Sequence, residues 1–556
     1  MKTGRNKQCH CGSGKKYKRC HGWLGATPAP APQAGAPFLI YKEQQEAQER
    51  VRQAQQGRGK PIISARFKGT QMVAVGNRIY QSPKWKTFAD FLRYYLNSKL
   101  GSEWIKAELN KPVAQRHTIM QWSEALFQLR NNVIKSAEEP VSMEVNGVLA
   151  CFFGLAYSLY LLDHNVELQD RLIARLKNQS NFQGAYYEAL VARALINAGF
   201  DLTLEDEADG LTKHCEFAAV SKDTGQKFWI EAKMRGVAGL LGKTDKDGAS
   251  ARTAGKATSM LISHLNSALQ KPAADQRMIF IDLNAEMAAD TDDDNRPAFA
   301  KEATARLQRY ERENLEAGQA AYVFVTNMTF HRDLLGPAQM LTIPTGLGIP
   351  DFNRSGRLKL SEVYRRDKKH ADAFRVATSL SKLLTIPTTF DGQMPATVLH
   401  GDLPPVQIGK KYCFEGAAPD GADLEATVAD ATVMENEKAA YVAVNVAGNQ
   451  SYILKQPMSD HQLADYHDHK DSYFGKVKRV SEGVSTPYDL FRFFVDAYSA
   501  MTRMQLLEKM KIADRDAREL SDEDLLLSYC ERLVAASGMF DSVDGVLMPK
   551  AVKPEA

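Results

Sequence analysis

Apolar positions in the first part of the chain recur with the spacing of helices. Side chains such as Phe88, Phe91 and Leu92 follow the i, i+3, i+4 pattern that places them on one helix face. The stretch from Gly147 to Leu162 is apolar on nearly all sides, but polar groups interrupt it, which favours a buried helix. The pattern predicts a mainly helical domain over residues 41–180.

The middle of the chain changes to short strands that alternate with helices. Residues 182–198 are amphipathic and Gly199 is a typical helix stop. The turn from Ser221 to Gln226 joins two strand-like runs as a hairpin. In chain order, we expect strands at 200–204, 215–220 and 227–233, a helix at 256–269, and strands at 278–283 and 322–326. This order predicts an α/β core over residues 181–335, with a mixed sheet flanked by helices.

The two ends of the chain have different patterns. Residues 24–40 are rich in Ala, Pro and Gly, which is typical of an extended, semi-rigid linker after a separate module at residues 1–23. Residues 336–556 are predicted to form a C-terminal α/β accessory region. Two-residue alternation predicts strands within 406–414 and 441–454, and helical spacing predicts helices at 490–510 and 523–536.

Composition limits the classes of protein that need to be considered. The 556 residues are 44% hydrophobic, enough for several folded domains, and the formal net charge is only +4. Four of the seven cysteines are scattered singly, which does not suggest a disulfide framework and favours a cytoplasmic protein. The chain shows no apolar signal core and no run of eighteen apolar residues, so we expect no membrane partner.

The first 23 residues combine a positive charge with a metal-binding pattern. They contain seven Lys or Arg residues and no acid. Cys9 and Cys11 precede a Gly-Ser-Gly turn, and Cys20 and His21 follow it, so these four side chains can close a tetrahedral zinc site. The run resembles the SEC-C zinc motif known from the C-terminal tail of the SecA motor, with His10 where proline is usual. The alternative is a disordered basic extension with incidental cysteines.

A second group of chemically suggestive residues lies in the predicted hairpin. Glu231 and Lys233 are two residues apart on one strand, so both point to the same face. Glu216, on the partner strand, can pair beside Glu231. Two adjacent carboxylates repel each other, and Mg²⁺ or Mn²⁺ would relieve that repulsion. Lys233 could then orient a metal-bound water and neutralise charge on a phosphate, while Glu188 on the preceding helix could hold another water.

Together, Glu188, Glu216 and the run Glu231-Ala232-Lys233 resemble the PD-(D/E)XK (restriction endonuclease-like) nuclease superfamily over about residues 182–285. In that family a helix that bears an acid precedes a strand that bears Asp or Glu, and a hairpin leads to the D/E-x-K strand. The usual Pro-Asp is Cys215-Glu216 here. The resemblance implies Glu216 and Glu231 as magnesium ligands, with Lys233 and Glu188 as catalytic residues.

We therefore expect a metal-dependent endonuclease that hydrolyses phosphodiester bonds in DNA, with RNA not excluded. The basic zinc module would recruit nucleic acid or a protein partner. Two alternatives remain for the hairpin: an inactive relative of the fold, and a common cross-strand salt bridge on a solvated sheet face. At the level of function, the alternative is a non-enzymatic zinc-binding adaptor that docks a chaperone, a ribosome or another protein.

Overall fold

The computed structural model describes most of the chain and divides it into two compact units, Met1–Arg50 and Val51–Ala556. The described residues are 36–133, 143–168, 170–204, 216–243, 256–287, 297–353, 359–390, 392, 394–446, 450–476, 486–538, 540–543 and 546–549. Helix α1 (Ala36–Gln56) is the one described element of the first unit, and it continues into the second. Residues 36–40 are thus helical, which corrects the C-terminal end of the expected linker.

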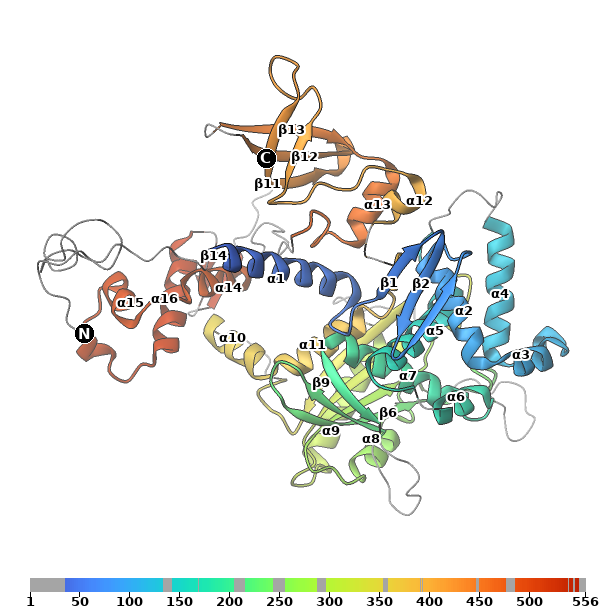
Figure 1. The fold of residues 1–556 in the computed structure, drawn as a ribbon. Coiled ribbons are helices and arrows are strands. Elements are labelled where there is room, and N and C mark those ends of the chain that lie inside the picture. The colour runs from blue at the N-terminus through green and yellow to red at the C-terminus, as the bar shows by residue number, and fades with distance from the viewer. Residues whose placement is uncertain are drawn as a thin grey trace, which may run out of the picture. The chain divides into compact units, whose positions relative to one another are not determined.

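Helices and strands of the second unit form a mixed α/β structure, as predicted (Figure 1). The helices are α2 (Phe88–Leu100), α3 (Ser102–Leu109), α4 (Thr118–Val133), α5 (Gly147–Asn165), α6 (Asp170–Lys177), α7 (Phe182–Ala198), α8 (Leu261–Leu269), α9 (Ala298–Glu313), α10 (Leu360–Lys369), α11 (Ala371–Ser381), α12 (Pro395–His400), α13 (Asp460–Asp468), α14 (Pro487–Tyr498), α15 (Arg503–Met510) and α16 (Asp522–Ala536). The strands are β1 (Ile63–Phe67), β2 (Thr70–Val75), β3 (Arg78–Ser82), β4 (Phe200–Leu204), β5 (Phe217–Ser221), β6 (Lys227–Met234), β7 (Gln276–Asp282), β8 (Ala321–Met328), β9 (Met340–Leu347), β10 (Lys411–Phe414), β11 (Leu424–Met434), β12 (Ala439–Val446), β13 (Gln450–Pro457), β14 (Phe540–Val543) and β15 (Val546–Pro549).

A six-stranded sheet in the order β4-β5-β6-β7-β8-β9 forms the centre of the structure. Strands β4, β5 and β6 are an antiparallel meander, and β7 then pairs parallel to β6. Helix α8 makes the crossover between β6 and β7, and α9 makes the crossover between the parallel strands β7 and β8. Strand β9 closes the sheet antiparallel to β8. The strands that the hydrophobic pattern predicted are all present, within a few residues of their expected ends.

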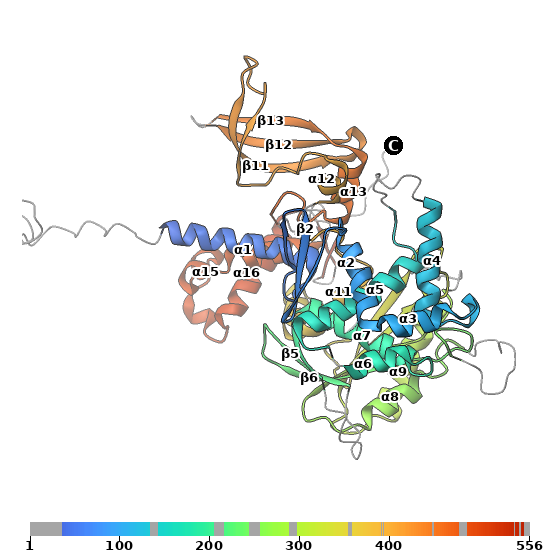
Figure 2. The same cartoon turned by 45° about the vertical axis from the view of Figure 1, so that its right-hand side comes forward.

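Helices cover both faces of this sheet, which explains its continuously apolar central strands. All eight residues of β8 are buried, as expected for a strand with helices above and below it. On one face, side chains of α5 and α7 share a core with Ile230 and Ala232 of β6. On the other face, Ile279 and Ile281 of β7 pack with α8 and α9. Figure 2 shows α5, α7 and α11 gathered on the first face, where α7 contacts both other helices.

The core extends beyond the boundaries expected from the sequence. Strand β9 lies after residue 335 yet belongs to the central sheet, and α11 packs against β9 and α7. One hydrophobic core contains residues from Val73 to Phe390. It therefore joins the expected helical domain and the expected α/β core, because α5 and α7 pack directly on each other. The α/β core begins near its expected start but ends later than residue 335.

The rest of the second unit contains a smaller sheet and a helical segment. Strands β10 to β13 form an antiparallel four-stranded sheet in sequence order. The expected helix over 490–510 is two helices, α14 and α15. The second begins at a new capping box, in which Thr502 accepts from the backbone of Gln505. This cap stops the chain from continuing as one helix although the apolar spacing runs through.

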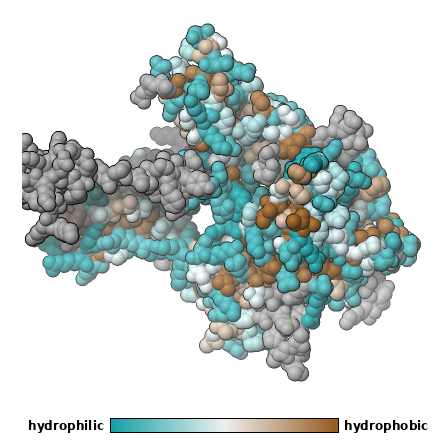
Figure 3. Space-filling view, in the orientation of Figure 1, coloured by the Kyte–Doolittle hydropathy of each residue, from teal (hydrophilic) through white to brown (hydrophobic). Residues whose placement is uncertain are grey.

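Helix α5 is buried, as its apolar pattern predicted. Among the described residues it is the one helix long and apolar enough to cross a membrane, but 83% of its most apolar stretch is buried inside the protein. Asn146 begins the helix by accepting a hydrogen bond from the backbone of Leu149. The side of the molecule in Figure 3 is mainly hydrophilic, with apolar patches scattered over it. The apolar side chains of α5 therefore pack in the hydrophobic core of the protein.

Candidate active site

The β5–β6 hairpin places Glu216 beside Glu231. Phe217 pairs with Ile230 in the antiparallel ladder, and the backbone N–H of Glu216 donates to the carbonyl of Ile230 over 3.0 Å. One further step along the ladder brings Glu216 opposite Glu231. The backbone therefore holds the two carboxylates at one position of the sheet, as the hairpin pattern predicted.

Alternation along β6 divides its side chains between the two faces as expected. Ile230 and Ala232 belong to the core on the α7 side. Glu231 and Lys233 point to the other face, where their parallel partners on β7 are Ile279 and Ile281. Glu231 is only 2% exposed, so its charge lies in a largely apolar part of the structure and requires compensation.

Two lysines supply that compensation. The Lys233 ammonium lies 3.0 Å from Oε1 of Glu216 and 2.9 Å from Oε2 of Glu231. Lys271, which follows α8, also forms an ion pair with Glu231, and its ammonium lies 3.7 Å from Oε1 of Glu216. The cross-strand ion pair of the salt-bridge alternative is therefore present. It is not on a solvated face, because the side chains of all four residues are at most 23% exposed.

Glu188 reaches the same region from helix α7. Arg175 of α6 holds its carboxylate with two hydrogen bonds of 2.7 and 2.5 Å. Burial raises the pKa of Glu188 to about 7, in spite of the opposing hydrogen bond from Arg175, and the charge of Glu216 contributes to the rise. The charges of Glu216 and Lys233 both affect this pKa, so Glu188 lies near them, but its hydrogen bonds come from Arg175. The direct contacts among the predicted residues are those of Lys233 with Glu216 and Glu231.

Burial and charge act in opposite directions on the other groups of this cluster. Burial raises the pKa of Glu231, although the charge of Lys233 opposes the rise. Burial alone would lower the pKa of Lys233, but the charges of Glu231 and Glu216 outweigh it, and the pKa is raised. Lys233 therefore stays an ammonium throughout the physiological pH range. Burial lowers the pKa of His264 on α8, and the Lys233 charge lowers it further.

Glu216 and Glu231 are the residues here that could hold a divalent cation, but in the structure their oxygens contact the ammonium groups of Lys233 and Lys271. Oxygens of Glu216 and Glu231 lie within 3.0 Å of the same Lys233 nitrogen, so they are no more than twice that distance apart. Both ammonium groups would have to move before these oxygens could approach one Mg²⁺, which binds carboxylates at about 2.0–2.1 Å. Within the described residues, no group of three or more His, Cys, Asp and Glu side chains is arranged to hold a metal. The remaining ligands of such a cation would be waters, as Mg²⁺ prefers.

Sequence reasoning missed three residues of the cluster: Arg175, His264 and Lys271. Each lies on or next to a helix that the hydrophobic pattern predicts, but nothing in the local sequence indicates that it approaches Glu188, Lys233 or Glu231. A weak signal existed for Lys271, a lone cation just before Pro272 at the helix end, between the two strands that flank the crossover. The tertiary fold brings these residues together.

The proposed zinc ligands Cys9, Cys11, Cys20 and His21 lie outside the described residues. Residues 5–22 match the family model of the SEC-C motif. The protein translocase subunit SecA of Rubrobacter xylanophilus is 58% identical over 33 residues, which are 6% of this chain and 4% of the SecA subunit. No solved structure matches the chain. The chain thus carries a SEC-C motif, a zinc-binding motif, at its N-terminal end, and the match does not extend to the α/β core.

We expect one zinc ion for each chain, because three thiolates and one imidazole complete a closed tetrahedral site. Metal analysis of the purified protein should give this ratio, and the Cys9→Ser/Cys11→Ser double variant should lose the zinc. Cys413, which is exposed in the C-terminal sheet, offers a matched control. A Cys413→Ser variant should keep its zinc. Full zinc content in the double variant would contradict this ligand set.

Proposed function

We propose that the protein is a metal-dependent nuclease that hydrolyses phosphodiester bonds, with DNA as the favoured substrate. The observation that carries this proposal is the convergence of Glu216, Glu231 and Lys233 at one position of the β5–β6 hairpin, with the ammonium within 3.0 Å of both carboxylates. An accidental charged face would not bury Glu231 to this extent, since an isolated buried carboxylate is costly. Buried carboxylates with raised pKa values are typical of functional sites.

The order of elements around the cluster also supports the proposal. Helix α7 bears Glu188, strand β5 follows Glu216, and β6 bears Glu231-Ala232-Lys233. The crossover through α8 then leads to β7, parallel to β6. The resemblance to PD-(D/E)XK nucleases requires a helix with an acid, a strand with an acid, and a hairpin to the D/E-x-K strand, in this order. The Glu in place of the usual Asp at residue 216 keeps the carboxylate and lengthens the side chain.

Each residue of the cluster has a role in this proposal. Glu216 and Glu231 would hold Mg²⁺ or Mn²⁺, which supplies a Lewis acid and an activated water when it is bound. Lys233 orients the attacking water and neutralises negative charge that builds up on the scissile phosphate. Arg175 fixes the Glu188 carboxylate, which accepts a hydrogen bond from a second water. Lys271 keeps the charge of Glu231 balanced before the substrate binds.

The basic SEC-C module completes the proposal as a recruitment element. Its seven cations attract a polyanion through phosphate contacts that do not depend on sequence. A protein partner for the same module is the adaptor alternative, in which the α/β core only supports the zinc module. Binding of a protein partner through this module, without cleavage of any nucleic acid, would indicate that alternative.

The decisive experiment incubates the purified full chain with plasmid, linear and single-stranded DNA and with RNA, in Mg²⁺, in Mn²⁺ and in EDTA. We expect cleavage that requires the divalent cation. DNA and RNA are compared at equal nucleotide concentration to establish the substrate. Absence of cleavage on every substrate in both metals would contradict the proposal, and so would cleavage that continues in EDTA.

The pKa of Glu188 predicts how cleavage depends on pH. If the ionised carboxylate assists, the rate should rise with pH through about 7 and fall roughly tenfold per unit well below it. In a Glu188→Gln variant the rate should be lower at pH 8, and the inflection near 7 should disappear because the titrating group is gone. Steady-state rates from pH 5.5 to 8.5 at saturating Mg²⁺ measure both effects. An unchanged inflection in the variant would assign the titration to another group.

A further inference from the structure

A second site candidate is a large cavity on the α11 side of the protein. Its volume is about 780 Å³, and its walls come from the end of α1, the end of α7, and helices α10, α11 and α14. Arg58 and Arg375 line it, and both bind Asp223 in the turn of the β5–β6 hairpin. That turn is the end of the hairpin away from Glu216 and Glu231. The cavity is therefore separate from the carboxylate cluster.

More cations than carboxylates line the cavity wall, although Arg58 and Arg375 pair with Asp223 and Asp372 behind it, and Arg366 pairs with Asp367. Its two carboxylates are Asp367 and Asp496, and its six cations are Arg58, Arg366, Lys368, Arg375, Lys382 and Arg492. Lys368 binds Glu523, outside the cavity wall. Lys382 and Arg492 are exposed, and within the described part of the chain neither forms an ion pair. Cations that line a concave site with few carboxylates favour an anionic ligand.

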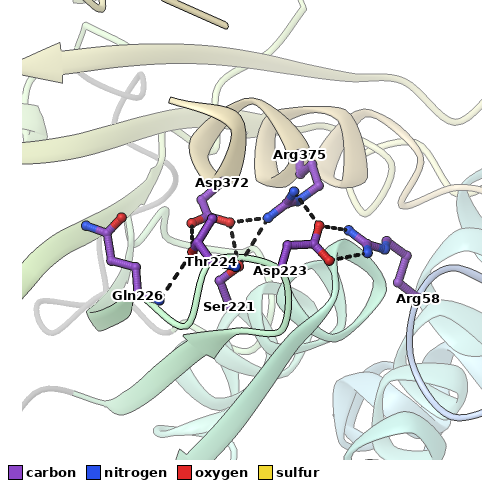
Figure 4. Close-up of polar contacts among 7 residues, drawn as sticks. All are labelled: Arg58, Ser221, Asp223, Thr224, Gln226, Asp372 and Arg375. Atoms are coloured by element: carbon purple, nitrogen blue, oxygen red, sulfur yellow. Dashed lines mark hydrogen bonds and ion pairs between the residues drawn. The ribbon is translucent and has the colours of Figure 1, made fainter. Parts of the chain in front are cut away.

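A polar network holds two of these cations in position (Figure 4). Asp223 accepts two hydrogen bonds from Arg58, of 2.7 and 2.6 Å, and also binds Arg375 at 2.5 Å. Asp372 of α11 also binds Arg375. Its carboxylate accepts hydrogen bonds from the hydroxyl groups of Ser221 and Thr224, each 2.6 Å long. The two guanidinium groups are thus oriented before any ligand arrives, which lowers the entropic cost of binding.

Arg193 adds a buried positive charge directly behind the cavity wall. Its side chain is fully buried, its Nη2 donates to the carbonyl of Thr385 over 2.7 Å, and its guanidinium lies 4.7 Å from the ring centre of Tyr157. Thr385 and Tyr157 both line the cavity. Within the described residues no carboxylate forms an ion pair with Arg193, and its Nε and Nη1 have no hydrogen-bond partner. An anion in the cavity would compensate this charge.

Aromatic side chains form another part of the wall. Tyr364 of α10, Phe374 of α11 and Tyr488 of α14 are half-buried and line the cavity. Arg366 lies over Phe374, 5.8 Å from its ring centre. Half-buried rings beside arginines are the combination on which nucleobases stack in single-stranded nucleic-acid sites. Phe374 is already stacked on Phe352, with ring centres 4.9 Å apart, so Tyr364 and Tyr488 are the rings that remain for a ligand. Cations with these two rings indicate a ligand that has both a phosphate and a planar base.

We propose that this cavity binds a nucleoside phosphate. The volume lies within the range of small-molecule sites, which is about 300–1,000 Å³. The cations contact the phosphates, and the base stacks on the aromatic wall. A free nucleotide and the phosphorylated end of a nucleic-acid strand share this chemistry. The proposal does not depend on the proposed nuclease activity, because none of the cavity residues belongs to the carboxylate cluster.

The test is calorimetric titration of the full chain with ATP, adenosine and inorganic triphosphate, in EDTA so that no cleavage occurs. We expect ATP to bind about tenfold or more tightly than either fragment, since each fragment lacks one of the two contact types. A short single strand with a 5′-phosphate and the same strand without it are titrated in parallel. A preference for the phosphorylated strand over ATP identifies a strand end as the source, and the reverse identifies a free nucleotide.

A double variant tests where the nucleotide binds. Lys382→Ala/Arg492→Ala removes two exposed cations of the cavity that have no ion pair in the described residues, so folding should be unaffected. ATP affinity should fall by about tenfold or more. The matched control is Lys68→Ala/Arg78→Ala, which removes one exposed cation in the β1–β2 turn and one on β3, and its affinity should equal that of the wild type. No ATP binding at millimolar concentration, or an equal affinity in the cavity variant, would overturn the proposal.

Discussion

Replacement of Lys233 by alanine is expected to slow metal-dependent phosphodiester cleavage by about 10²–10³-fold. The Lys233 ammonium contacts both carboxylates, and its raised pKa keeps it charged at the pH of the assay. Its loss removes the cation that, among the described residues, contacts both proposed metal ligands most closely while remaining partly exposed, whereas Lys271 binds mainly Glu231. The measurement is the initial rate of cleavage in Mg²⁺ on the substrate that the wild type cuts best.

The same strand offers a matched control for this variant. Lys227 also lies on β6, on the same face as Lys233, but it is exposed and its closest carboxylate, Asp275, is 3.9 Å away. A Lys227→Ala variant should cleave at the wild-type rate. Circular dichroism establishes that both variants are folded, and Lys271 still compensates Glu231 in the absence of Lys233. Equal cleavage rates for the two variants would indicate that the active site lies elsewhere in the protein.

Replacement of Asp282 by alanine is expected to lower the free energy of unfolding by about 3–5 kcal/mol. Asp282 ends β7, is fully buried, and accepts hydrogen bonds from the Thr326 hydroxyl and from the backbone N–H groups of Met328 and Asn284 over 2.8–3.0 Å. Burial raises its pKa to about 7, against the effect of these hydrogen bonds. Alanine would leave the buried backbone N–H groups of Met328 and Asn284 without this acceptor, and the Thr326 hydroxyl would keep only the Tyr187 hydroxyl as partner. Each buried donor left without an acceptor typically costs about 1–3 kcal/mol.

Urea unfolding monitored by circular dichroism measures this loss, and an unchanged slope indicates that the same surface is exposed on unfolding. Asp275, just before β7, gives the control because its side chain is 39% exposed and, among the described residues, its one ion pair is the long contact with Lys227. Asp275→Ala should change the stability by less than about 0.5 kcal/mol. If the two variants were equally stable, the hydrogen-bond network of Asp282 would not contribute to the fold.

The hydrophobic pattern was sufficient for the elements that carry the candidate site. Helix α7 has the predicted bounds, and β6 differs by one residue from its prediction. Strong local signals explain this success. Gly199 ends α7 in the left-handed conformation at a φ of 93°, and the turn after Ser221 has the glycine that its geometry requires, at Gly225. Alternation on β6 then determines that Glu231 and Lys233 share a face.

Long-range pairing explains the elements that the pattern missed. Strand β9 contains Pro344 and Gly346, which weaken a strand signal in the sequence. It becomes a strand by pairing with β8 at the edge of the sheet, a contact that the local sequence does not indicate. Helix α9 follows an acidic stretch and has few apolar positions on its one buried face. The expected domain boundary near residue 180 is absent because α5 and α7 bury their apolar faces against each other.

The sequence alone determined the SEC-C motif, the mixed α/β class, and the side of the sheet to which Glu231 and Lys233 point. These properties depend on residues that are close along the chain, where spacing and turn chemistry act directly. Only the tertiary structure decided that Arg175 and Lys271 join the carboxylates, and that Arg58, Arg375 and Arg492 line one cavity. Such contacts arise when distant segments pack, and their free energy comes from burial and charge compensation that no local pattern records.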